Sequence, residues 1–97
     1  MRSTELVVAL QRAEQAFLDG ATDAGIGVRA VLDRIEAATP GGAPLHAQLD
    51  NVRKWLGAFE RPDDHQRFGG AEHLREYVVT QIRIAHGALE DYERQTG

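Results

Sequence analysis

Apolar residues recur at intervals of three or four positions between Glu72 and Tyr92, which is the clearest pattern in the chain. Residues spaced in this way share one face of an α-helix. Only Gly87 interrupts the pattern from Ala71 to Arg94, so the sequence predicts one helix of roughly 36 Å at 1.5 Å per residue. The predicted buried stripe consists of Leu74, Val78, Ile82, Ala85, Leu89 and Tyr92.

A second apolar group lies along one flank of this helix. Tyr77, Ile84 and Ala88 fall beside the stripe, so the apolar surface is wider than contact with a single neighbour requires. An exposed apolar strip of this kind marks an interaction site more often than chance. We expect this flank to meet another protein or a second copy of the chain.

The N-terminal part of the chain contains two further stripes at helical spacing. Asp19-Gly20 is typical of a helix end, and Thr22 or Asp23 is typical of a residue that caps the next helix. Because each glycine inside a helix costs roughly 1 kcal/mol, we predict a break here. The second stripe continues the phase of the first, so one long helix from Ser3 to Thr39 is the alternative. The two stripes are Leu6, Leu10, Ala13 and Phe17, then Ala24, Val28, Val31, Ile35 and Ala38.

A third stripe follows a Pro-Gly-Gly loop. Pro44 suits the first turn of a helix, where a backbone N–H has no partner within the helix, and Arg61-Pro62 ends the segment. Asp50 and Lys54 are four positions apart, and we expect them to form an ion pair. This stripe consists of Leu45, Leu49, Val52, Leu56 and Phe59.

These patterns predict an all-α fold, a small helical bundle of four helices in up-and-down order, with residues 1–97 in a single domain. Three helices, one of them a long N-terminal helix, are the alternative. The hydrophobic fraction of 42% and the charged fraction of 27% are ordinary for a globular protein and unlike those of a disordered chain. We therefore expect the chain to fold.

Eleven basic and fifteen acidic residues give a formal charge of −4, which argues against binding of nucleic acid through phosphate neutralisation. A local basic run around Trp55 and Phe68 is the one place where an acidic partner could dock. The run consists of Arg53, Lys54, Arg61 and Arg67. No apolar stretch is long enough for a signal peptide or a membrane span, so we expect a cytoplasmic protein, with export by a route that reads no N-terminal signal as the alternative.

The segment 61–70 is the longest one without a helical stripe. Loops of this kind carry function more often than the elements they join, so we treat its polar and aromatic residues as candidates for partner binding. They are Arg61, Asp63, Asp64, His65, Arg67 and Phe68. At the end of the last helix, Glu90, Asp91 and Glu93 lie at the negative end of the helix dipole, a local mismatch that can mark a site for a basic partner.

Catalytic and metal-binding patterns are weak. The chain has no cysteine, Ser3 is its only serine, and no histidine pair has ligand spacing, so we expect neither an enzyme nor a bound cofactor. One compact group of possible ligands leaves a metal-dependent enzyme or carrier as a minor alternative. It consists of Asp63, Asp64 and His65, with Glu72 and His73 nearby. We expect His86 to pair with Glu90 one helical turn later.

The tripeptide Trp55-Leu56-Gly57, in a chain of this length, resembles the motif of the WXG100 family of small secreted helical hairpins. The resemblance implies that Trp-x-Gly lies at a turn between two long helices and that a Tyr-x-x-x-Asp/Glu signal follows. Here Trp55 falls inside a predicted helix, and the fourth residue after Tyr77 is Gln81.

By exclusion, the sequence favours a non-catalytic module that binds another protein, as an adaptor, regulator, inhibitor or self-associating homodimer. A secreted WXG100-like helical protein is the alternative. Neither nucleic acid nor membrane is an expected partner.

Overall fold

A computed structural model describes the backbone of residues 3–96 and the side chains of residues 5–95. Four long helices account for most of this range, and a short helix with a 3-10 turn joins the last two. The long helices are α1 (Ser3–Leu18), α2 (Ala24–Ala38), α3 (Ala43–Glu60) and α5 (Ala71–Thr96). The connection holds α4 (Pro62–His65) and η1 (Gln66–Phe68).

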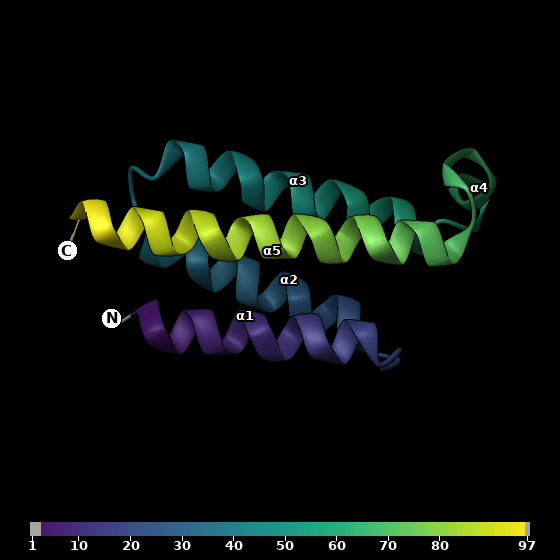
Figure 1. The fold of residues 1–97 in the computed structure, drawn as a ribbon, viewed down its shortest axis with the longest axis horizontal. Coiled ribbons are helices and arrows are strands. Elements are labelled where there is room, and N and C mark those ends of the chain that lie inside the picture. The colour runs from purple at the N-terminus through teal and green to yellow at the C-terminus, as the bar shows by residue number, and fades with distance from the viewer. Residues whose placement is uncertain (1–2, 97) are drawn as a thin grey trace.

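The four long helices form an up-and-down bundle in the cyclic order α1, α2, α3, α5 (Figure 1). The bundle measures 43 × 23 × 17 Å, and α5, at about 39 Å for 26 residues, runs nearly its whole length. Helix α5 packs against both α1 and α3. The predicted all-α bundle of four long helices is confirmed, with α4 as an additional short element.

The break between α1 and α2 lies where the glycine pattern predicts it. Gly20 has a positive φ of 76°, its N–H binds the carbonyl of Phe17, and the Ala21 N–H binds the carbonyl of Ala16. These two hydrogen bonds form the Schellman motif that closes many helices. The alternative prediction of one long helix from Ser3 to Thr39 is therefore wrong. Asp23 does occupy the cap position of α2, but its side chain makes no capping hydrogen bond.

The α2–α3 loop is a tight turn fixed from two sides. Gly41 has a φ of 78°, and the Gly42 N–H binds the Thr39 carbonyl, as in a type II turn with Pro-Gly at its centre. Thr39 is buried, and its hydroxyl donates to the Ile35 carbonyl at 2.7 Å. The Tyr92 hydroxyl donates to the Pro40 carbonyl at 3.2 Å and so ties the end of α5 to this turn.

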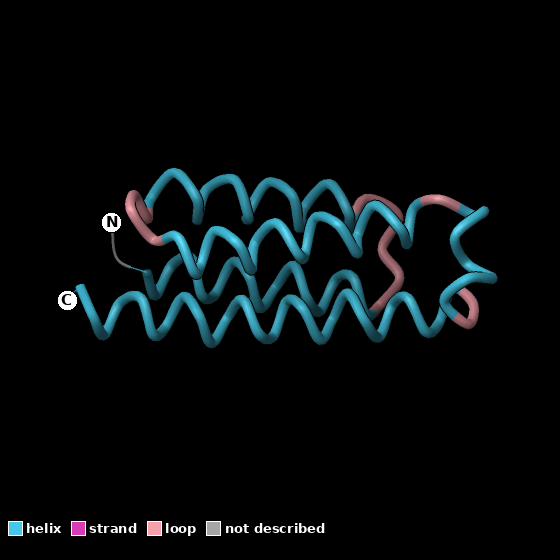
Figure 2. Tube along the Cα trace, turned by 90° about the horizontal axis from the view of Figure 1, so that it is seen from above, coloured by secondary structure: helices cyan, strands magenta, loops and turns pink. Residues whose placement is uncertain are grey.

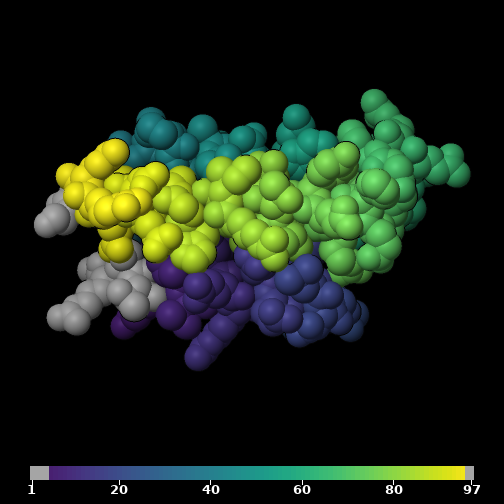
Figure 3. Space-filling model, in the orientation of Figure 1, coloured from purple at the N-terminus to yellow at the C-terminus, as the bar shows by residue number. Residues whose placement is uncertain are grey.

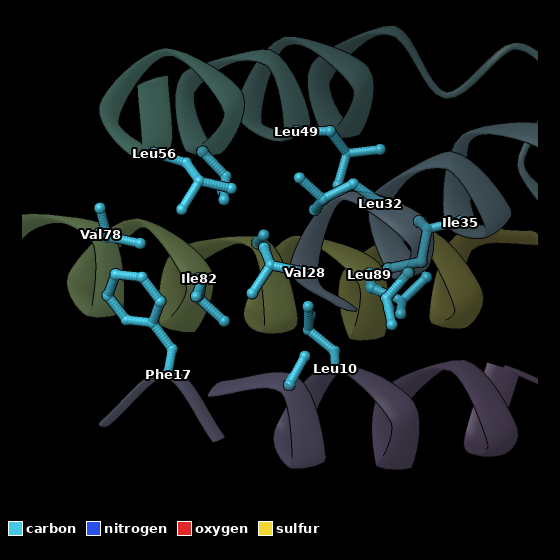
Figure 4. Close-up of a cluster of buried hydrophobic side chains, with 14 of the residues drawn as sticks. Leu10, Phe17, Val28, Leu32, Ile35, Leu49, Leu56, Val78, Ile82 and Leu89 are labelled. Carbon is cyan, nitrogen blue, oxygen red and sulfur yellow. The ribbon is translucent and has the colours of Figure 1, made fainter. Parts of the chain in front are cut away.

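Side chains from all four long helices meet in one core (Figure 4). Every residue of the predicted stripes is buried or packed against this core. The periodicity missed Leu32 and Val79, which are also buried because each lies beside its helix's main stripe, at a contact with a neighbouring helix. Phe17 and Phe59 cross the bundle from α1 to α3, with ring centroids 5.0 Å apart and edge to face.

The α3–α5 connection is more ordered than a loop. Pro62 starts α4, η1 follows at once, and Gly69, with a φ of 86°, ends η1. Figure 2 shows this connection projecting beyond the α1–α2 turn at the same end of the bundle. None of the described helices is long and apolar enough to cross a membrane.

Candidate functional site

The outward face of α5 carries apolar side chains that the rest of the chain covers only in part. Ile84 is 49% exposed and Tyr77 is 43% exposed, whereas Ala88 is partly buried against the core. In Figure 3, α5 crosses the middle of the visible face, between α3 and α1. We call the uncharged positions on the outward side of α5, which Glu76 and Arg83 flank, the outer strip. The outer strip consists of Tyr77, Thr80, Ile84, Gly87 and Ala88.

Three aromatic rings extend the outer strip onto α3 and η1. The Trp55 ring lies 5.1 Å from the Tyr77 ring and 5.2 Å from the Phe68 ring, the second contact being edge to face. We call Trp55, Phe68 and Tyr77 the aromatic cluster. All three rings remain partly open to solvent. The structure therefore joins Phe68 of the 61–70 segment to Tyr77 of the α5 flank, two candidates that the sequence treated separately.

Beside the aromatic cluster lies a hollow of about 180 Å³ with a basic rim. Lys54 Nζ lies 5.9 Å from the centre of the Trp55 ring, and the Arg67 guanidinium lies 5.9 Å from that of Phe68. Such cation–ring contacts are favourable when the cation faces the ring. We call this the basic hollow. Its lining residues are Lys54, Trp55, Ala58, Arg61, Asp64, Arg67 and Phe68.

One acid offsets part of this charge. The Asp64 carboxylate accepts from Arg61 Nε at 2.6 Å and lies 3.7 Å from Arg67 Nη1. Lys54 forms no ion pair with any described side chain, because Asp50 instead binds Arg53 at 2.8 Å. The predicted Asp50–Lys54 pair is thus wrong, and the basic hollow keeps three cations against one carboxylate.

Arg53 does not belong to this surface, although the sequence grouped it with the basic run. It points toward α2 and binds Asp33 at 2.8 Å and Glu36 at 3.0 Å. Partial burial by itself would lower the pKa of Arg53, but hydrogen bonds to Glu36, Asp33 and Asp50 raise it above its ordinary value. Arg53 joins α2 to α3 and serves the fold.

His65 and Asp63 do not line the basic hollow. His65 is partly buried, and its Nε2 lies 2.7 Å from the Phe59 carbonyl oxygen, so this nitrogen carries the proton and the ring closes the end of α3. Asp63 is exposed. The His65 ring also lies 6.1 Å from the Phe59 ring, so its contacts within the chain hold it against the end of α3.

The opposite end of α5 is acidic on its outer side. Asp91 has a 63% exposed side chain that accepts from Arg94, and Glu90 has a 57% exposed side chain. The predicted His86–Glu90 pair is confirmed, with Nε2 and Oε1 3.4 Å apart. Charges of both signs therefore lie near each end of the outer strip: Glu76 stands beside Tyr77 at one end, and Arg94 pairs with Asp91 at the other.

A second hollow, of about 170 Å³, lies under the α1–α2 turn. Its ionisable groups are engaged in structural contacts. Arg75 Nη1 donates to the Phe17 carbonyl at 2.6 Å, and the guanidinium lies 5.1 Å from the Phe59 ring. Glu60 binds Arg29 through two hydrogen bonds of 2.5 and 2.7 Å, and these hold the pKa of Glu60 below its ordinary value. This arrangement offers no unengaged acid–base pair.

The possible metal ligands between Asp63 and His73 do not come together around a common point. Across the described residues, no group of three histidine or acidic side chains could hold a metal ion. His73 instead packs its ring over Gly69, where a Cβ atom would lie 3.2 Å from the imidazole. The region shapes the turn into α5.

Trp55-Leu56-Gly57 lies within α3 and not at a turn between helices. Trp55 packs at the core edge, Leu56 is fully buried, and Gly57 lies beside the Arg61 side chain. The tripeptide is therefore in a different structural position from the one that the WXG100 resemblance implies.

Two surface residues, Trp55 and Gln48, were not among the partner-binding candidates predicted from the sequence. Gln48 Nε2 donates to both the backbone carbonyl and the side-chain oxygen of Gln81, at 3.0 and 2.9 Å, and closes the seam between α3 and α5. The sequence placed Trp55 at the edge of the α3 stripe, a position that indicates partial exposure. No local pattern pairs it with Tyr77, because the two residues are 22 positions apart.

Comparison with protein-family models, with curated proteins and with solved structures finds no match to this chain. The geometry of the surface is therefore the basis for a functional proposal.

Proposed function

We propose that this protein is a non-catalytic helical module that binds another protein through the outer strip of α5 and the adjoining aromatic cluster. The observation that carries the proposal is the run of partly exposed rings from Phe68 through Trp55 to Tyr77, with exposed Ile84 two helical turns further along the same side of α5. Aromatic side chains and arginine are enriched at protein interfaces and dominate their binding energy.

The bundle fixes this surface before any partner arrives. Trp55 and Tyr77 project from two packed long helices, and Phe68 is fixed by the η1 turn that Gly69 closes. Binding therefore orders few additional side chains, which reduces its entropic cost. The other large apolar residues that the described part of the chain exposes, Val8, Leu18 and Ile26, lie on α1 and α2 and not on this surface. Such isolated residues are normal on protein surfaces.

Site-directed photocrosslinking tests the proposal. A photoreactive phenylalanine analogue in place of Tyr77, in cells that carry the gene, should capture a defined protein that mass spectrometry identifies. Ile84→Arg in the same chain should abolish capture, because it places a charge in the centre of the apolar surface.

Ile26→Arg is the matched control, since it makes the same change at a residue that is 72% exposed on α2. It should leave capture unchanged. Equal capture by the Ile84→Arg and Ile26→Arg chains would exclude the outer strip as the binding surface.

A further inference from the structure

The basic hollow combines aromatic side chains with cations that have unused hydrogen-bond donors. Trp55 and Phe68, which meet edge to face, supply the aromatic part of its lining. Three cations and one carboxylate supply the charged part, so the lining has an excess of two positive charges. These four residues are Lys54, Arg61, Arg67 and Asp64. A group that fills the hollow should therefore offer both apolar surface and negative charge.

The cations of the hollow are only partly engaged within the chain. Lys54 forms no ion pair with any described side chain, and its Nζ lies 5.9 Å from the centre of the Trp55 ring. Arg61 donates to Asp64 through Nε, and its two terminal nitrogens have no hydrogen-bond partner among the described residues. Arg67 lies 3.7 Å from Asp64, which is too long for a hydrogen bond. These groups can therefore donate to an incoming carboxylate without first breaking a contact of the bundle.

The other acids at this end of the bundle do not line the hollow. Asp63 is exposed on α4 outside the lining. Glu76 lines a different hollow between α1 and α5, which it shares with Arg83. Three more acids are paired elsewhere: Asp50 with Arg53, Glu60 with Arg29, and Glu72 with Arg75. The excess of positive charge is therefore local to the hollow between α3 and η1.

The size and charge of the hollow limit what can occupy it. Its volume of about 180 Å³ is below the roughly 300–1,000 Å³ of small-molecule sites, so it suits a single side chain of a larger partner. A nucleic acid would need several neutralised phosphates along its backbone, and a chain with a formal charge of −4 offers only this local excess. A protein segment is the occupant that these limits favour.

We propose, building on the proposed function, that the partner is a protein that places an apolar side chain in the basic hollow, with acidic side chains beside it that bind the three cations. The apolar side chain packs against Trp55 and Phe68 and excludes water, which strengthens the ion pairs at the rim. The rest of the partner follows the aromatic cluster through Tyr77 onto the outer strip, whose uncharged positions suit an apolar contact.

Trp55 allows a direct measurement, because it is the only tryptophan of the chain and its fluorescence reports on the hollow. The probe is the peptide acetyl-Glu-Glu-Phe-Glu-Glu-amide, and the control peptide has lysine in place of each glutamate. The acidic peptide should change the Trp55 emission to saturation, with a dissociation constant on the order of 1 mM, and the lysine peptide should not. Added salt should weaken the binding.

Variants of the rim, each checked for helicity by circular dichroism, locate the binding. Lys54→Gln and Arg67→Gln should each weaken binding of the acidic peptide about two- to fivefold, because each removes one partly exposed ion pair. Arg12→Gln is the matched control, since it removes the same charge from an exposed arginine on α1. It should leave the affinity unchanged. An equal loss for Arg12→Gln and Arg67→Gln would assign the binding to net charge and overturn the inference.

Lys54 gives a second test on the partner itself, because it is the only lysine of the chain. A carbodiimide joins an amine to a carboxylate in direct contact with it. In the complex captured at Tyr77, this reagent should link Lys54 to an aspartate or glutamate of the partner, which mass spectrometry maps. Lys54→Arg keeps the charge, so it should keep photocapture at Tyr77 and lose this link. Lys54→Glu should reduce photocapture as well.

Equal responses of Trp55 to the acidic and the lysine peptide would overturn the inference. A response to inorganic phosphate without one to the acidic peptide would do the same, as would photocapture that Lys54→Glu leaves unchanged. In that last case the proposed function stands, because it depends on Ile84. Acidic-peptide binding at Trp55, together with equal photocapture by the Ile84→Arg and Ile26→Arg chains, would instead keep the hollow and reject the outer strip.

Discussion

The two faces of α5 differ in what they contribute. Ile82 on the inner face is fully buried with Val78 and Leu89, whereas Ile84, two residues later, is 49% exposed. Both residues are isoleucine on the same helix, so only their direction separates them. The inner face stabilises the bundle, and the outer face is available for a partner at little cost in stability.

The largest difference between the faces should appear on truncation of these two isoleucines. Ile82→Ala removes fully packed atoms and should lower the free energy of unfolding by about 2–5 kcal/mol. Ile84→Ala should change it by less than about 0.5 kcal/mol. Urea unfolding at a concentration where the chain is monomeric measures both. Similar losses for the two variants would show that the outer strip belongs to the core.

Two arginines of α5 give a polar version of the same contrast. Arg75 donates to the Phe17 carbonyl and lies over the Phe17 and Phe59 rings, so Arg75→Gln should cost about 1–2 kcal/mol. Arg83 has a 63% exposed side chain paired with Glu14, and Arg83→Gln should cost less than about 0.5 kcal/mol. Urea midpoints with unchanged slopes check this order. If Arg83→Gln instead lowered stability more than Arg75→Gln, the exposed Arg83–Glu14 pair would be the stronger contact between α1 and α5.

Two glycines should respond with opposite sign to the same substitution. Gly20 has a φ of 76°, so Gly20→Ala should destabilise the bundle by about 1 kcal/mol. Gly87 is helical and faces open space, so Gly87→Ala should stabilise the isolated chain by about 0.5–1 kcal/mol. Stabilisation by Gly20→Ala would contradict the Schellman turn.

The smallest effect concerns an exposed ion pair that joins α2 to α3. Arg29 lowers the pKa of Glu60, so the stability from this pair is present above the ordinary value of 4.5 and is lost as pH falls through the lowered pKa. Glu60→Gln should cost less than about 1 kcal/mol at neutral pH, since both side chains are about 40% exposed. It should also reduce the fall in stability between about pH 5 and about pH 3. The free energy of unfolding, measured at several pH values for both chains, checks this. If its dependence on pH is the same with and without Glu60→Gln, the Arg29–Glu60 pair is not the source of the loss of stability in acid.

Local sequence chemistry determined most of the fold. The period of the apolar residues set the four long helices and the inner face of α5, and Gly20, Pro44 and the Thr39-Pro40 turn set their ends. These signals act within a few residues, because helical periodicity and turn conformations are local properties. The same information placed Ile84 and Tyr77 on a flank.

The sequence also identified most residues of the surface, but not which of them lie side by side. It grouped Arg53 with Lys54 because they are neighbours in the chain, yet a step of one residue turns the side chain by about 100° around the helix. Arg53 therefore points to α2 and Lys54 to the basic hollow. Likewise, the 61–70 segment looked like a loop because α4 and η1 are too short to show a periodic stripe.

What the sequence by itself determined is the all-α class, the limits of the last two long helices, and the apolar flank of α5, whereas it favoured the break near Gly20 over one long N-terminal helix without deciding it. Only the tertiary structure decided that Trp55, Phe68 and Tyr77 meet, that His65 closes α3, and that Lys54, Arg61 and Arg67 line one hollow. The physical reason is that these properties depend on how α3, η1 and α5 pack against one another, and packing joins residues far apart in the chain that no local periodicity relates.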